Sequence, residues 1–103
     1  MSKGIITLCG STRFYEMFLE VNNKLTAAGY IVLSIGVVKS AAVSKLKVML
    51  DELHKEKIAM SNAILVIDVN GYIGKSTKSE IEFAKKHSKK IYYLSEWNDK
   101  LCE

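Results

Sequence analysis

The sequence is poor in arginine, in cysteine and in long apolar runs. Of its 103 residues, one is an arginine and two are cysteines, Cys9 and Cys102. Two cysteines in such positions do not suggest a disulfide framework, and no stretch reaches the roughly 20 apolar residues of a membrane span. The apolar run behind the amino terminus is too short for a signal peptide. We therefore expect a soluble, cytoplasmic protein with no membrane partner.

Local metal-ligand spacing is missing as well. The two histidines, His54 and His87, have no second histidine or cysteine two to four residues away, as a compact zinc motif would require. Cys9 lies inside an apolar stretch, where its side chain should join the strand packing rather than react. The sequence therefore predicts no metal and no cofactor.

The net charge of +4 comes from lysines spread over the chain, with one cluster at residues 85–90. Such a cluster can contact nucleic acid, but cations also complement the dipole at a helix carboxyl end. No aromatic interleaving or nucleic-acid motif accompanies the cluster. The helix-end interpretation is favoured, and nucleic acid is not the expected partner.

Apolar and amphipathic segments alternate through a single domain, residues 1–103. The periodicity predicts strands at 5–9, 30–35, 63–67 and 90–94, and helices at 13–28, 44–61 and 77–87. Short apolar strands separated by helices predict an α/β fold whose parallel sheet has helices on both faces. Right-handed crossovers favour the Rossmann-like or flavodoxin-like strand order 2-1-3-4. Residues 36–43 and 95–103 have no readable pattern.

In that order, ligands bind beyond the carboxyl ends of the first and third strands. The first strand is followed by Gly10, Ser11, Thr12 and Arg13. A strand-to-helix turn of this kind offers backbone N–H groups and hydroxyls to an anion, and the arginine fork matches phosphate or carboxylate. The alternative is that Ser11 or Thr12 only caps the helix and that Arg13 is a solvated residue.

The loop behind the third strand is the second candidate. It contains two glycines that allow tight bends, a tyrosine that stacks on a base or covers the loop, and two hydroxyls that open a helix with an anion-friendly N-terminus: Gly71, Gly74, Tyr72, Ser76 and Thr77. The two loops should meet at the same edge of the sheet. That convergence predicts one binding site built from both.

Three titratable residues near these loops are catalytic candidates. Glu80 is a potential carboxylate nucleophile toward a sugar anomeric carbon, although Thr77-x-x-Glu80 also has the spacing of a capping box, which spacing alone favours. His54 is a potential general acid/base or a half-buried packing residue. Asp68 is a potential acid/base or the cap of its own turn.

Taken together, the motifs resemble the nucleoside 2-deoxyribosyltransferase-like superfamily, which includes 2′-deoxynucleoside 5′-phosphate N-hydrolases. The resemblance extends over residues 5–94. It is carried by a strand followed by Gly-Ser-x-Arg, by His54-x-x-Lys57-Ile58 before the third strand, and by Gly71-Tyr72-Ile73-Gly74-x-Ser76-Thr77-x-x-Glu80.

The resemblance implies that Glu80 attacks C1′ of a nucleoside or nucleotide and displaces the base, while Ser11 and Arg13 hold a 5′-phosphate. Two departures from the family concern the base side of the site. His54 stands where the family has a general-acid aspartate, and the loop containing Tyr72 is longer than in the characterised hydrolases.

Three functions follow as hypotheses. The first is an enzyme that cleaves or exchanges an N-glycosidic bond, the second a nucleotide-binding module without catalysis, and the third a nucleic-acid-binding lysine face. Relatives complete their sites with a neighbouring subunit, so a homodimer is expected, with Val37, Val38 and Trp97 as candidate interface residues.

Overall fold

The computed structural model of the chain describes residues 1–35 and 43–97, with the side chains of residues 43 and 44 excepted. The unassigned segment 36–42, including the interface candidates Val37 and Val38, lies outside the described residues. The tail from residue 98 onward lies outside them too.

Four strands form one parallel sheet in the order β2-β1-β3-β4, as the sequence predicts. The strands are β1 (Ile5–Gly10), β2 (Ile31–Leu33), β3 (Ala63–Ile67) and β4 (Lys90–Tyr93). β1 pairs with β3 from Ile6 opposite Ala63 to Gly10 opposite Ile67. Every residue of β3 is buried, because helices cover both faces of the sheet and leave no solvated face for polar residues.

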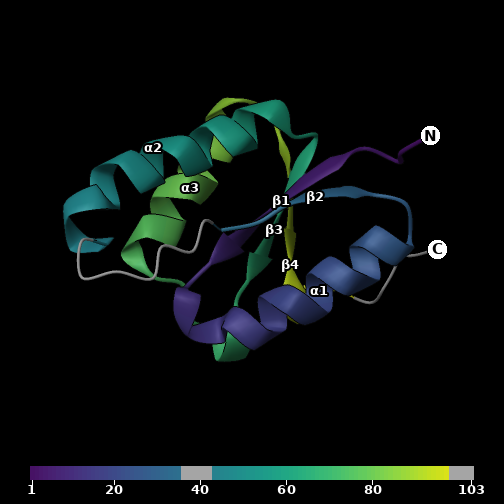
Figure 1. Cartoon of the computed structure of the whole chain (residues 1–103), viewed down its shortest axis with the longest axis horizontal. Coiled ribbons are helices and arrows are strands. Elements are labelled where there is room, and N and C mark those ends of the chain that lie inside the picture. The colour runs from purple at the N-terminus through teal and green to yellow at the C-terminus, as the bar shows by residue number, and fades with distance from the viewer. Residues whose placement is uncertain (36–42, 98–103) are drawn as a thin grey trace.

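Three helices connect the strands: α1 (Tyr15–Ala27), α2 (Val43–Met60) and α3 (Lys75–Lys86). α1 lies on one side of the sheet, and α2 and α3 lie together on the other (Figure 1). A short 3-10 turn, Thr12–Phe14, precedes α1, which therefore begins two residues later than expected. α3 begins two residues earlier than expected, with Gly74 as its N-cap residue.

The two sides of the sheet have different cores. On the α1 side the buried cluster is entirely apolar and contains Ile6, Leu8, Phe18, Val21, Leu25, Ala63, Leu65 and Ile67. On the α2/α3 side it contains Cys9, Ile58, Ile64, Val66, Ile81 and Ala84. Successive residues of a strand point to opposite faces, so β1 sends Ile6 and Leu8 toward α1, and Thr7 and Cys9 to the other side.

Gly10 is required by packing at the end of β1. Its φ of +154° lies in a region that side chains rarely adopt, and a Cβ there would lie 3.1 Å from the Ile67 carbonyl oxygen and 3.2 Å from Phe18. The glycine therefore lets the first loop leave the sheet close to β3, whether or not a ligand also approaches it.

The carboxyl-terminal part corrects one expectation and confirms another. Trp97 is partly buried against the α1-side core, so it is not a free interface residue. Lys85 and Lys86 occupy the last turn of α3, as the helix-end interpretation predicts. Among the described residues, no helix combines the length and the apolar character needed to cross a membrane.

Candidate functional site

A cavity of about 1040 Å³ opens at the carboxyl ends of the strands, beside α2. Both predicted loops contribute to its wall, together with the histidine of α2. The predicted site residues that line it are Gly10, Ser11, Thr12, Tyr72, Gly74, Ser76, Thr77, Glu80 and His54. Arg13, Gly71 and Asp68 are not among the lining residues. The two loops therefore meet in the structure as predicted, but fewer residues line the cavity than the sequence suggested.

Glu80 lies in the second turn of α3, and its side chain faces the sheet. The capping-box interpretation is wrong, because α3 begins at Lys75 and Thr77 is inside the helix rather than at its N-cap. Glu80 is 8% exposed. Burial, and then the negative charge of Asp51, raise the pKa of this carboxyl from 4.5 to about 7, because both disfavour the ionised form.

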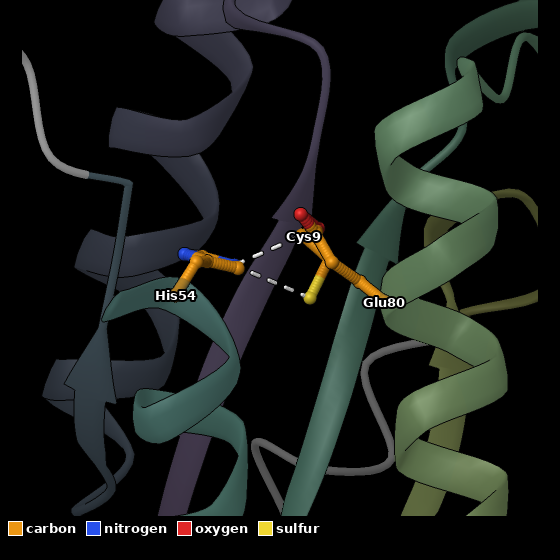
Figure 2. A group of neighbouring side chains, drawn as sticks. All are labelled: Cys9, His54 and Glu80. Carbon is orange, nitrogen blue, oxygen red and sulfur yellow. Dashed lines mark hydrogen bonds and ion pairs between the residues drawn. The ribbon is translucent and has the colours of Figure 1, made fainter. Parts of the chain in front are cut away.

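His54 faces Glu80 from α2, with its Nε2 3.7 Å from Glu80 Oε1 (Figure 2). The histidine is 6% exposed. Burial, and then the charge of Lys57, lower its pKa from 6.5 to about 4. The ring is therefore neutral at physiological pH, so it can accept a hydrogen bond or a proton, but it does not hold the proton that a general acid must donate.

Cys9 completes this buried group from β1. Its Sγ lies 3.5 Å from His54 Nε2, and its side chain is fully buried. Burial, and then the nearby Glu80, raise the pKa of the thiol well above its ordinary value. The sequence correctly placed Cys9 in the strand packing but did not reveal its polar neighbours. The available signal was strand parity, which puts Cys9 on the same face as Thr7, toward α2.

Asp68 ties the end of β3 to the carboxyl-terminal segment. One carboxylate oxygen accepts a hydrogen bond from the Ser95 backbone N–H at 2.8 Å, and the other accepts one from the Ser95 hydroxyl at 2.6 Å. The side chain is buried and does not line the cavity. Its geometry is that of a structural residue, and it gives no support to the acid/base role considered from the sequence.

Arg13 and Tyr72 join the two loops at the rim of the cavity. The Arg13 guanidinium lies 4.1 Å above the centre of the Tyr72 ring, and Phe14 meets the same ring edge-on at 5.9 Å. Ser11 Oγ accepts a hydrogen bond from the Arg13 backbone N–H at 3.2 Å, so Ser11 caps the 3-10 turn. Tyr72 thus covers the loop, and Arg13 is exposed beside it.

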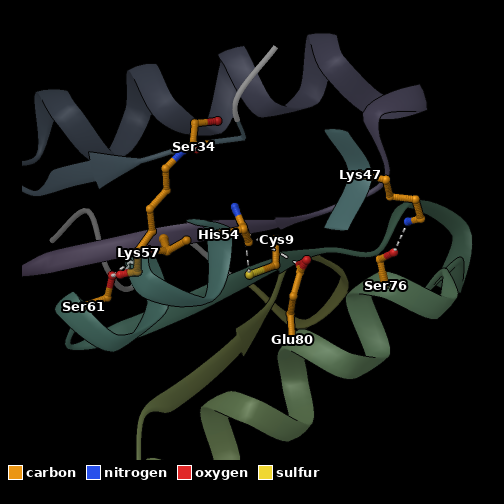
Figure 3. Close-up of polar contacts among 9 residues, drawn as sticks. Cys9, Ser34, Lys47, His54, Lys57, Ser61, Ser76 and Glu80 are labelled. Atoms are coloured by element: carbon orange, nitrogen blue, oxygen red, sulfur yellow. Dashed lines mark hydrogen bonds and ion pairs between the residues drawn. The ribbon is translucent and has the colours of Figure 1, made fainter. Parts of the chain in front are cut away.

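Lysines supply positive charge to the cavity wall. Lys47 donates to Ser76 Oγ at 2.9 Å, and Lys57 donates to the Ser34 carbonyl at 2.7 Å (Figure 3). Lys75 lines the wall at the N-terminus of α3. Lys47 and Lys75 lie beside the free backbone N–H groups at the N-terminus of α3, an arrangement that favours an anion, whereas Lys57 lies in the last turn of α2.

Asp51 is a site residue that the sequence reasoning missed. It lines the cavity from α2, and its carboxylate lies 3.6 Å from Lys47 Nζ. A usable signal was present, because residues three apart on a helix share a face, and Asp51 precedes His54 by three positions.

Comparison of the chain with protein-family models, with curated proteins and with solved structures finds no match in any of the three.

Proposed function

We propose that this protein binds a nucleoside or nucleoside 5′-phosphate in the cavity and cleaves or exchanges its N-glycosidic bond, with Glu80 as the nucleophile. The observation that carries the proposal is the position of the Glu80 carboxyl group. It is buried on a rigid helix, lines the cavity, and lies one and a half turns from a helix N-terminus that favours an anion. A single ligand with a sugar between a base and a phosphate would span both features.

The phosphate is assigned to the N-terminus of α3. Backbone N–H groups there are supplemented by Lys47, Lys75 and the hydroxyls of Ser76 and Thr77, all of which line the cavity. The Gly10–Thr12 turn lies on the β1 side of the same cavity and is assigned to the sugar hydroxyls. Arg13 contributes positive charge from the rim of the cavity.

The proposed reaction has two displacements at C1′ of the sugar. In the first, a Glu80 oxygen forms a bond to C1′ while the C1′–N bond breaks, and the leaving base takes the bonding electrons and a proton. In the second, water attacks C1′, releases the Glu80 carboxylate and gives up a proton. The net result is hydrolysis of a nucleoside to sugar and free base; a second base in place of water gives exchange.

Asp51 is the residue we assign to the removal of a proton from the attacking water. It lines the cavity, whereas Asp68 is held by Ser95. The Asp51 carboxylate takes the proton of the attacking water in the second displacement, whereas the leaving base takes its proton from solvent in the first.

The state of Glu80 sets an expected pH profile. Its pKa of about 7 means that the nucleophilic carboxylate forms as the pH rises through 7. We expect kcat/KM to increase with pH through this range, because that parameter reports ionisation in the free enzyme. A profile that is flat between pH 5.5 and about 8.5 would contradict the nucleophilic role of Glu80.

A nucleotide-binding module without turnover is the second candidate function. The observation that favours it is that Glu80 is largely protonated below neutral pH and packed against Cys9 and His54. Such a carboxyl group binds sugar hydroxyls as readily as it attacks carbon. The same cavity then senses or sequesters the ligand.

A homodimer belongs to the same proposal. α2 exposes Val48, Met49, Leu53 and Met60, and the last two also form part of the cavity wall. A second copy packed on this helix would bury these side chains and narrow the open cavity. Gel filtration with light scattering checks this, with Met49→Glu as a disrupting variant and Lys85→Glu as a control far along α3.

The deciding experiment has two readings from one panel of nucleosides and 5′-phosphates of ribose and deoxyribose. Released base is measured by chromatography, and binding by the shift of the melting temperature. A 2′-fluoro nucleoside slows hydrolysis of the ester, so intact-mass and peptide mass spectrometry can find a sugar on Glu80. Base release with an adduct on Glu80 supports the enzyme; melting shifts without base release support the binding module. If no nucleoside or nucleotide shifts the melting temperature, both are wrong.

A further inference from the structure

Cys9, His54 and Glu80 bring three different metal-binding atoms to one point in the fold. They come from β1, α2 and α3 respectively, and their side chains converge (Figure 2). Cys9 Sγ and His54 Nε2 are 3.5 Å apart, and His54 Nε2 and Glu80 Oε1 are 3.7 Å apart. All three ligand atoms lie within 4.8 Å of one another.

These separations match a tetrahedral zinc ion. Zinc binds sulfur at about 2.3 Å, imidazole nitrogen at about 2.0–2.1 Å and carboxylate oxygen at about 2.0–2.2 Å. At tetrahedral angles, these bond lengths place neighbouring ligand atoms roughly 3.3–3.6 Å apart. The two measured separations therefore need only small side-chain adjustments to surround one ion.

The kinds of ligand atom also select the ion. A thiolate with an imidazole suits Zn²⁺, whereas Mg²⁺ and Ca²⁺ require oxygen ligands. Cys9 and Glu80 would bind as anions, so a bound Zn²⁺ would be neutralised by its own ligands. That neutrality matters because all three side chains are buried, and an unbalanced charge there would be costly.

The surroundings fit a site with one open position. His54 and Glu80 line the cavity, so the fourth position faces it. Three protein ligands with an accessible fourth position are typical of catalytic zinc.

We propose that Cys9, His54 and Glu80 form a zinc-binding site at the floor of the cavity, with its fourth position open to water or a ligand. This inference does not rest on the proposed function. It shares Glu80 with it, and a carboxylate bound to zinc is no longer a free nucleophile. Zinc should therefore inhibit the base-releasing reaction, and a chelator that removes the zinc should relieve this inhibition.

The test begins with full-length, metal-free protein and Co²⁺ as the spectroscopic probe. Tetrahedral Co²⁺ with a thiolate ligand gives a sulfur-to-metal charge-transfer band and intense visible bands. Zinc affinity is then measured by competition with a chromophoric chelator and by bleaching of the Co²⁺ spectrum.

The chain provides a matched control for every proposed ligand. Cys9→Ala is paired with Cys102→Ala, His54→Ala with His87→Ala, and Glu80→Gln with Glu82→Gln. Because the protein has two cysteines and two histidines, the cysteine pair and the histidine pair each distinguish the site from the single other residue of that type. Glu82 is an exposed neighbour on the same helix. Circular dichroism checks that each variant folds, and Glu80→Gln is the variant least disruptive to the core.

We expect one equivalent of Co²⁺ or Zn²⁺ per chain, loss of the sulfur band in Cys9→Ala, and at least a 100-fold weaker zinc affinity in each site variant, more than the ~10–100-fold typical of outer-shell changes. The three controls should bind as the unmodified protein does. A sulfur band that survives in Cys9→Ala, or disappears in Cys102→Ala, overturns the proposal, as does unchanged zinc affinity in Glu80→Gln. The spectra are read without any substrate, so a failed site and a failed enzymatic function are separate results.

Discussion

The two faces of the sheet have different compositions and, we infer, different tasks. Against α1 the packed residues are apolar throughout, with Phe18, Val21 and Leu25 meeting the sheet. Against α2 and α3, polar groups are buried among the apolar ones. Those that lie there are Thr7, Cys9, His54, Ser61, Thr77 and Glu80.

Some of these polar groups are satisfied in the ordinary way. Thr7 and Ser61 hydrogen-bond each other and the Lys57 carbonyl, so they join β1 to α2 without an unpaired atom. Cys9, His54 and Glu80 are different, because their contacts with each other are long and burial displaces the pKa values of all three toward the neutral form. Such displaced groups cluster at functional sites. We therefore infer that the α1 face chiefly supplies stability and that the other face carries the proposed site.

The largest expected effect tests the chemical face. Glu80→Gln keeps the shape of the side chain but removes the attacking carboxylate, so base release from a confirmed substrate should fall by at least about 10⁴-fold. Initial rates by chromatography measure this, and Glu82→Gln should keep the original rate. Turnover within tenfold of the unmodified protein in Glu80→Gln would place the nucleophile elsewhere.

The second effect tests the structural face. Phe18 is 1% exposed, and Phe18→Ala should lower the free energy of unfolding by about 3–5 kcal/mol through lost burial and a residual cavity. Urea titration measures this loss. The control Leu19→Ala, on the exposed side of α1, should change the free energy of unfolding by less than about 0.5 kcal/mol. At a temperature where the variant stays folded, ligand affinity should be unchanged. A loss of affinity there would show that the two faces are not separable.

The third effect uses pH to separate the faces. The pKa of Glu80 rises from 4.5 unfolded to about 7 folded, so the folded state binds this proton more tightly. Its contribution to stability is complete below pH 4.5 and is lost as the pH rises through 7, by about 3 kcal/mol in total. Glu80→Gln has no such loss. Its stability relative to the unmodified protein should therefore increase by up to about 3 kcal/mol between pH 4.5 and 7.5.

The comparison must be made as a difference between the two proteins. The pKa of His54 is lowered from 6.5 to about 4, so its contribution is present above pH 6.5 and is lost as the pH falls through 4. This trend opposes that of Glu80 and is common to both proteins. Chemical denaturation at several pH values supplies the measurement, with Glu82→Gln as the control. A stability difference that stays constant with pH would mean that Glu80 is not held protonated.

The smallest effect concerns the cation that we propose holds a phosphate. Lys47 lines the cavity and reaches Ser76 at the N-terminus of α3, whereas Arg13 stacks on Tyr72 at the rim. Lys47→Ala should reduce the preference for nucleotide over nucleoside by about 1.5–3 kcal/mol, the value of a charge-assisted hydrogen bond. Arg13→Ala should reduce the same preference by only about 0.5–1 kcal/mol, the value of an exposed cation–π contact. Calorimetry with the nucleotide and with the nucleoside measures this preference in each variant. A larger reduction in Arg13→Ala than in Lys47→Ala would restore Arg13 as the proposed phosphate holder.

Much of the fold was predictable because its signals are local. The run Ala63–Ile67 is continuously apolar and became β3 with the same bounds, since a strand buried on both faces tolerates no polar alternation. The start of α3 was missed by two residues. Thr77 and Glu80 have capping-box spacing, but Gly74 ends the loop earlier, and tertiary packing then turns Glu80 inward.

The candidate site was predictable only in part. The sequence pointed to Glu80, His54 and the loops around the cavity, because chain order and right-handed crossovers bring those loops to one edge of the sheet. It could not exclude Asp68, whose partner Ser95 lies 27 residues away. It also missed Asp51, which has no distinguishing motif.

The sequence by itself determined the class of fold and the edge of the sheet where the cavity opens, since both depend on periodicity and on the order of segments along the chain. Only the tertiary structure decided that Cys9, His54 and Glu80 share one buried point. They are separated by 45 and 26 positions in the chain and belong to a strand and two different helices. No local spacing encodes such a meeting; it arises because α2 and α3 pack on the same face of the sheet, over the side chain of Cys9. The displaced pKa values of His54 and Glu80 have the same origin, since they come chiefly from burial, which exists only after the chain has folded.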